Sequence, residues 1–395
     1  MLNLKWQLSN TKPDDLIFYF IVLTFFLLPT GTAPPLISLG LAILFWLISG
    51  KILQIKSIIR QSWFFPVIPF LILPWIGLLY SQNLDIGMDY ALKTKYWIAL
   101  FITAGLTFDE KRLTILLKWF WAGLLMGAFL ALIQFIGIMT PIRKGFLGFG
   151  VVHTLICMYL IVGIMTASFY FEKAESWKDR CVLLFLILAF IFHLAVLKGR
   201  SGYLIFGIIS PFVANNLMYR FSLKIKMAVS IILVCALLSS PVVREVIKGT
   251  FIKLNDQKEK ILKGEDVKDF PRFFMVHEAV RIMIGHPIIG IGTGSLTEPS
   301  KAAGHLFPHP HNNFLYMGAS YGIFGIAACF WLFWKMFRLS WNLRKTALGY
   351  FVFSTCIVLF IGGMFDTQIL NTGTLLFLTL TYGLMNHMRN HAGPS

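Results

Sequence analysis

The stretch FGVVHTLICMYLIVGIMTASFYF (residues 149–171) decides the fold of this chain. It contains no Asp, Glu, Lys or Arg. As a helix rising about 1.5 Å per residue, it is long enough to cross the roughly 30 Å hydrocarbon core of a bilayer. Similar apolar runs recur along the whole length. Because backbone groups in lipid must be satisfied internally, and these runs lack the alternation of barrel strands, they are predicted to be helices.

The composition places the whole chain in a membrane. Its 395 residues are 57% hydrophobic and 13% charged, and a soluble domain carries about twice that charged fraction. The sequence therefore predicts an all-α, polytopic membrane bundle of about twelve transmembrane helices, forming a single integral membrane domain over residues 1–395. The candidate spans are 16–30, 34–50, 63–80, 96–108, 113–139, 149–171, 181–197, 201–219, 227–241, 311–334, 346–365 and 369–387.

Lysine and arginine mark one side of the predicted spans. With the N-terminus inside, the cytoplasmic connections hold most of them, whereas the opposite short loops hold few. Those few are Lys93, Lys95, Arg143, Lys144, Lys198 and Arg200. Both termini are therefore expected to be cytoplasmic, with the first apolar run an uncleaved span. The net charge of +17 is explained by this arrangement and not by a nucleic-acid partner.

The cysteines fall within apolar runs and lack the spacing of a metal site. They are predicted to be small core residues. They are Cys157, Cys181, Cys235, Cys329 and Cys356.

One long outward loop, residues 242–310, lies between predicted spans nine and ten. It contains the mixed-charge stretch KLNDQKEKILKGEDVKDF, which must lie in water or at the lipid headgroups. Pro241 and Gly264 bracket one expected surface helix, and Pro271 and Gly285 bracket a second. The sequence shows no internal repeat, which argues against a transporter built from duplicated halves.

The motif HPHNN (residues 309–313) marks the return from this loop into the tenth span. Pro310 suits the first turn of a helix, so His311 and Asn312 are expected near a helix N-terminus at the outer surface. Three glycines follow at helical spacing on one face, which predicts close helix packing. They are Gly318, Gly322 and Gly325.

Three motifs together resemble the O-antigen ligase and polymerase superfamily. They are HNNFLYMGASYGIFG (311–325), KGRSGYL (198–204) and PRFFMVHEAVRIMIGHPIIGIGTGS (271–295). One departure is that Val276 and His277 stand where an aromatic residue is expected. The resemblance implies glycan transfer from undecaprenyl pyrophosphate to a sugar hydroxyl on lipid A–core, at the periplasmic side of the bacterial inner membrane. No cofactor is implied.

A diphosphate leaving group requires cations fixed at the membrane surface, and arginine binds phosphate oxygens bidentately. Arg200 lies at the outer entry to the eighth span, and Arg272 begins a loop helix. These two are predicted to bind the diphosphate, with Arg281 and Lys198 as weaker candidates. The alternatives are a snorkelling residue for Arg200 and a solvated surface charge for Arg272.

His311 is the candidate general base for the acceptor hydroxyl, because a helix N-terminus and nearby arginines disfavour its imidazolium form. Direct attack at the anomeric carbon would invert its configuration. Asn312 could cap the helix or orient the donor, and capping is the favoured interpretation. For Tyr203, an aromatic residue at the membrane interface is the favoured interpretation over a substrate contact. For His309, a structural role is favoured over a substrate contact.

A metal ion is not predicted. His305, His309 and His311 offer nitrogen ligands, but Glu298 is the only acidic residue close to them in sequence. Asp85, Asp89 and Asp366 are candidates for binding acceptor sugars, and solvated turn positions are the favoured interpretation. His277 and His286 are expected to be a surface residue and a turn residue, respectively.

Two other functions stay open at this point. A polymerase of the same superfamily would use similar parts with a second lipid-linked glycan as acceptor, although one large late loop favours a ligase. A lipid-linked glycan transporter or flippase would be expected to place charges within its spans. Almost every ionisable residue falls in a loop here, which favours an enzyme working at the membrane surface.

Overall fold

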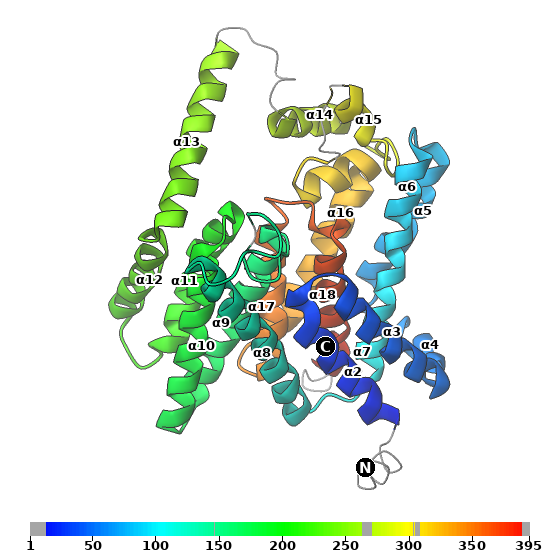
Figure 1. Ribbon diagram of the computed structural model, residues 1–395. Coiled ribbons are helices and arrows are strands. Elements are labelled where there is room, and N and C mark those ends of the chain that lie inside the picture. Colours follow the sequence, from blue (N-terminus) through cyan, green and yellow to red (C-terminus); the bar gives the residue numbers. More distant parts are fainter. Residues whose placement is uncertain (1–12, 146, 263–270, 303, 305–308, 389–395) are drawn as a thin grey trace.

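The fold is described from a computed structural model that covers residues 13–145, 147–262, 271–302, 304 and 309–388. The described residues form helices and loops with no strand, which confirms the predicted all-α bundle (Figure 1). The helices are α2 (Pro13–Leu27), α3 (Ala33–Ile48), α4 (Ile55–Ile58), α5 (Ile68–Ile76), α6 (Leu84–Ala91), α7 (Ile98–Gly105), α8 (Glu110–Phe135), α9 (His153–Lys173), α10 (Trp177–Val196), α11 (Arg200–Leu217), α12 (Leu223–Leu238), α13 (Pro241–Leu262), α14 (Pro271–Gly285), α15 (Thr297–Ala302), α16 (Asn313–Asn342), α17 (Ala347–Gly362), α18 (Thr372–Gly383) and α19 (Met385–Met388). Short 3₁₀ segments include η1 (Leu28–Thr30), η2 (Lys51–Gln54), η3 (Phe65–Val67), η4 (Gly77–Tyr80), η5 (Leu92–Trp97) and η7 (Gln368–Leu370).

Several helices are long and apolar enough to cross a membrane. Among the described residues there are 5 such helices, or up to 7 if two bent pairs each count as one span. Every predicted span contains a helix, but some are short: proline and glycine divide the third into η3, α5 and η4. The count of twelve spans therefore stays a prediction.

Helix α9, which contains most of the stretch quoted first, lies at the centre of the bundle against α10, α11 and α17. Without charged residues before its last turn, it can be buried on all sides. The Tyr159 hydroxyl donates to the Gly373 carbonyl over 2.9 Å, and the Tyr159 ring packs 5.0 Å from that of Phe377. These contacts join the middle of the chain to its last helices.

The two ends of the bundle differ. Helices α14 and α15 lie across the end where α16 begins, and α2 begins at the opposite end (Figure 1). At that opposite end, Lys51 pairs with Asp14 at 2.5 Å and Arg112 pairs with Asp15. These pairs fix the start of α2 to η2 and to the first turn of α8.

The predicted surface helices have the expected starting points. Helix α13 begins at Pro241 and α14 runs from Pro271 to Gly285, as expected from the bracketing residues. Gly264, the other predicted boundary, lies outside the described residues. Helix α14 packs on α16, so the position of Arg272 is fixed relative to the start of α16.

The glycine-rich segment after α14 holds together, through its backbone, the end of the bundle where α16 begins. The amides of Ile291 and Gly292 donate to the carbonyls of Ala319 and Ser320, each over 3.0 Å, and Thr293 N donates to Gly77 O over 3.1 Å. Gly290, at φ +66°, has no room for a side chain, because a Cβ there would lie 2.4 Å from Ser320 C. We call residues 287–295 the clasp.

The clasp interrupts helix α16 at Gly322. The prediction that Gly318, Gly322 and Gly325 lie on one face of a continuous helix is therefore wrong. Gly322 has φ 60° and ψ −146°, far from helical values, and the Ile323 amide donates to Pro287 O over 2.8 Å. Gly318 does pack closely, against Met283 of α14. Gly325 instead lies against Met317 O across the break.

Two of the five cysteines correct the prediction that all are core residues. Cys157, Cys329 and Cys356 are buried, whereas Cys181 and Cys235 are exposed on α10 and α12. An apolar run alone does not specify which side of its helix faces the bundle.

Candidate functional site

The HPHNN motif attaches the start of α16 to the loop after α17. Asn312 is the helix N-cap, and its side-chain oxygen accepts from Phe314 N and Leu315 N, which confirms the predicted capping role. Its amide side chain donates to Met364 O over 3.0 Å. Asn313 N donates to Gly363 O over 2.7 Å. The motif therefore fixes the position of the 363–369 loop.

His311 adopts an unusual backbone conformation. Pro310 precedes the helix instead of occupying its first turn, which corrects the expected placement. His311 has φ 49° and is the one non-glycine residue with positive φ among the described residues. Such conformations cost free energy and cluster at functional sites. Here the conformation directs the ring toward the 363–369 loop.

Asp366 is the partner of His311. Its Oδ1 lies 3.2 Å from His311 Nδ1, and the side chains are 17% and 16% exposed for His311 and Asp366 respectively. Burial raises the pKa of the Asp366 carboxyl, but hydrogen bonds from His311 and Thr154 outweigh burial, so the pKa lies below its ordinary value. Asp366 is thus an anion that orients a histidine, and its predicted role as a solvated turn residue is wrong. Asp85 and Asp89 are exposed, as expected.

His309 lies against the same pair. Its ring centroid is 4.7 Å from that of His311. Burial and, to a smaller extent, the charges of His311, Lys93 and Arg272 lower the pKa of His309, and Asp366 opposes them; the net result is a pKa of about 4. His309 is therefore neutral at pH 7. Helix α14 packs on α16, and the charge of Arg272 in its first turn acts on His309.

The two arginines of α14 have different surroundings. Arg272 is exposed in the first turn, near His309. Arg281 Nη2 lies 2.7 Å from the Glu278 carboxylate, and Glu278 is buried. Arg281 thus neutralises a buried carboxylate on its own helix. His277 and His286 are exposed, as predicted.

Arg200 lies at the first position of α11, and it and Lys198 are exposed. Gly199 between them packs against His153, at the start of α9. Thr154, the next residue of α9, hydrogen-bonds to Asp366, so the start of α9 lies between the KGRSGYL motif and the His311–Asp366 pair.

Tyr203 is buried, and its hydroxyl donates to Leu197 O. It connects α11 to the end of α10, and its ring packs inside the bundle.

The site also contains a possible set of metal ligands. His309, His311 and Asp366 each offer a ligand atom within 4.8 Å of the others. However, Lys93 and Arg272 both act electrostatically on His309, and nearby cations disfavour a bound cation. Glu298 hydrogen-bonds to Asn83, away from this set, and His305 lies outside the described residues.

The fold and the site together define a helical membrane protein with a half-buried histidine–aspartate pair at one end of its bundle, near exposed arginines. Residues 182–330 match the family described as O-antigen ligase. This confirms the resemblance that the three motifs indicated. The match includes Arg200, Arg272 and His311 but ends before Asp366. A comparison with curated proteins gave no match.

Proposed function

We propose that this protein is an O-antigen ligase that transfers a glycan from undecaprenyl pyrophosphate to lipid A–core, on the periplasmic side of the inner membrane. The observation that carries the proposal is the His311–Asp366 pair, beside the arginine-bearing α14. Termini in the cytoplasm and α14 in the periplasm agree with the distribution of lysine and arginine.

The proposed reaction is a single displacement. Asp366 accepts a hydrogen bond from His311 Nδ1, so Nε2 takes the proton of the acceptor hydroxyl. The acceptor oxygen forms a bond to the anomeric carbon as the bond from that carbon to the diphosphate oxygen breaks. The diphosphate leaves with the electron pair, and Arg200 and Arg272 stabilise its charge. The proton on His311 then passes to water.

The distribution of charge supports an enzyme over a transporter or flippase. Glu278 is the one Asp, Glu, Lys or Arg in the buried class among the described residues, and it lies on α14 and not within a span. A conduit for a charged lipid would be expected to carry ionisable groups near the midplane. Polymerase activity would use the same pair with a different acceptor.

The test is transfer by purified protein in liposomes, with an undecaprenyl-pyrophosphate glycan supplied with and without lipid A–core. A product that requires lipid A–core supports the ligase. Chain growth on donor alone would identify a polymerase. Movement of the donor across the bilayer without a new glycosidic bond would overturn the enzyme proposal.

Asp366→Asn should lower kcat about 100-fold with little change in the KM of the donor, because general-base catalysis by His311 is weakened. Asparagine can occupy the same space, but it does not stabilise the imidazolium formed during the reaction. Steady-state kinetics check this result, with Asp85→Asn as a control at an exposed acidic position. An equal loss in both variants would contradict a specific role for Asp366.

Arg272→Gln should raise the KM of the donor about tenfold, because one charge-assisted contact to the diphosphate is lost. Arg281→Gln should instead lower the thermal unfolding temperature, because Glu278 would stay buried without its partner. Kinetics and thermal unfolding of both variants check this contrast. The reverse pattern would assign the diphosphate contact to Arg281.

Transfer should persist in a chelator such as EDTA, since the proposed chemistry uses a base and fixed cations. Initial rates before and after dialysis against the chelator measure this. A loss that Zn²⁺ or Mg²⁺ restores would show that His309, His311 and Asp366 form a metal site.

A further inference from the structure

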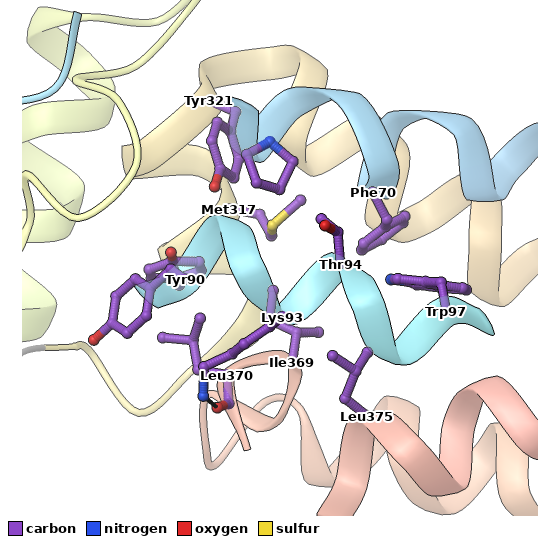
Figure 2. A pocket seen from close by; sticks show the side chains of 12 residues that line it. Phe70, Tyr90, Lys93, Thr94, Trp97, Met317, Tyr321, Ile369, Leu370 and Leu375 are labelled. Atoms are coloured by element: carbon purple, nitrogen blue, oxygen red, sulfur yellow. Dashed lines mark hydrogen bonds between the residues drawn. The ribbon is translucent and has the colours of Figure 1, made fainter. Parts of the chain in front are cut away.

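A small cavity lies about one to three helical turns from His311 along α16. Its volume is about 40 Å³, and a cavity of roughly 10–15 Å³ on this measure holds one water. Its walls come from α5, α6, η5, α16, the η7 loop and α18, and they are mostly apolar, with five aromatic rings among twelve lining residues (Figure 2). Phe70, Tyr90, Trp97 and Met317 are among the lining side chains. The cavity therefore suits a short apolar group.

Lys93 is the one charged residue in this lining. Its ammonium donates to the Leu370 carbonyl (Figure 2) and lies 6.0 Å from the centre of the Tyr90 ring. The carboxylates of the described residues form no ion pair with it. Burial lowers the pKa of Lys93, and the charge of Asp89 partly opposes this effect. An ammonium has three donors, so two can serve a ligand.

Lys93 also lies close to the His311–Asp366 pair. Leu370, which accepts its hydrogen bond, belongs to the same loop as Asp366. The charges of Lys93 and Arg272 both lower the pKa of His309. Cations from two distant parts of the sequence therefore act on the same histidine. A diphosphate bound next to His309 would therefore interact with the charges of both Lys93 on η5 and Arg272 on α14.

We infer that Lys93 binds the diphosphate of a polyisoprenyl donor and that the aromatic cavity beside it takes the first apolar unit of the chain. The inference rests on the proposed function. A partly desolvated ammonium attracts an anion more strongly than an exposed one does, and the cavity matches the chemistry of the group next to the diphosphate. Lys93 lies outside the matched residues 182–330.

A measurement of ligand binding tests this inference independently of glycan transfer. Purified protein in neutral detergent is titrated with geranylgeranyl diphosphate by calorimetry. Lys93→Met removes the charge and keeps the chain length, so the Kd should rise about tenfold. Lys93→Arg should bind within about threefold of wild type. Lys95→Met is the matched control, because Lys95 lies on the same element and is exposed, and its Kd should not change.

Two further ligands separate the possible sources of affinity. Inorganic pyrophosphate should bind more weakly than geranylgeranyl diphosphate, and equal binding would overturn the role of the cavity. Phosphatidylglycerol in mixed micelles should not compete, and full competition would overturn diphosphate recognition. An unchanged Kd for a folded Lys93→Met variant would overturn the role of Lys93.

The inference and the proposed function can fail separately. Lys93-dependent binding in a protein without transfer activity would support the inference and contradict the ligase. Transfer with an unchanged donor KM in Lys93→Met would support the ligase and overturn the inference.

Discussion

Replacing His311 with asparagine should lower the rate of glycan transfer by about 10²- to 10⁴-fold, the usual contribution of a general base. Asparagine is chosen because it tolerates the left-handed backbone conformation that His311 adopts at φ 49°. The variant should therefore keep the start of α16 intact. Initial rates at saturating donor and acceptor measure the effect.

His277→Asn is the control for this experiment, because His277 is exposed on α14 and has no proposed role in the chemistry. Its rate should equal that of the wild type. Thermal unfolding of both variants separates a lost base from a lost fold. A folded His311→Asn protein that keeps more than about a tenth of the rate would contradict His311 as the base.

Gly290→Ala should destabilise the protein by about 3 kcal/mol or more. Alanine is strained at φ +66°, and its Cβ would lie within 2.5 Å of the Ala319 carbonyl oxygen. Because these atoms belong to backbone on both sides, relief requires the clasp to move away from α16. The thermal unfolding temperature in detergent measures the loss.

Gly285→Ala provides the comparison, since Gly285 ends α14 and a Cβ there would have no neighbour within 4 Å among the described residues. It should unfold near the wild-type temperature. If Gly290→Ala is as stable as Gly285→Ala, the clasp does not hold α14 on α16, and the proposed position of Arg272 loses its structural basis.

The helices could be predicted from the sequence because apolar runs and helix ends are local features. The N-cap at Asn312 and the boundaries of α14 follow from residues within a few positions of each helix end. The break at Gly322 could not be predicted, because the backbone of the clasp, some thirty residues earlier, replaces the missing helical hydrogen bonds.

The candidate site was predictable in part for the same reason. His311 and the arginines occur in motifs, but Asp366 follows His311 by 55 residues and resembles an ordinary loop aspartate. The asparagines of HPHNN bring it into place by binding the backbone of its loop. Lys93 likewise had no local signal, since its contact with Leu370 joins residues 277 positions apart.

The most direct test of the central claim is the anomeric configuration of the new glycosidic bond, measured by NMR on the purified transfer product. Attack by an acceptor hydroxyl that His311 has deprotonated predicts inversion relative to the lipid-linked donor. Retention would require a covalent glycosyl–enzyme intermediate or another two-step route, and it would contradict the single displacement at the His311–Asp366 pair.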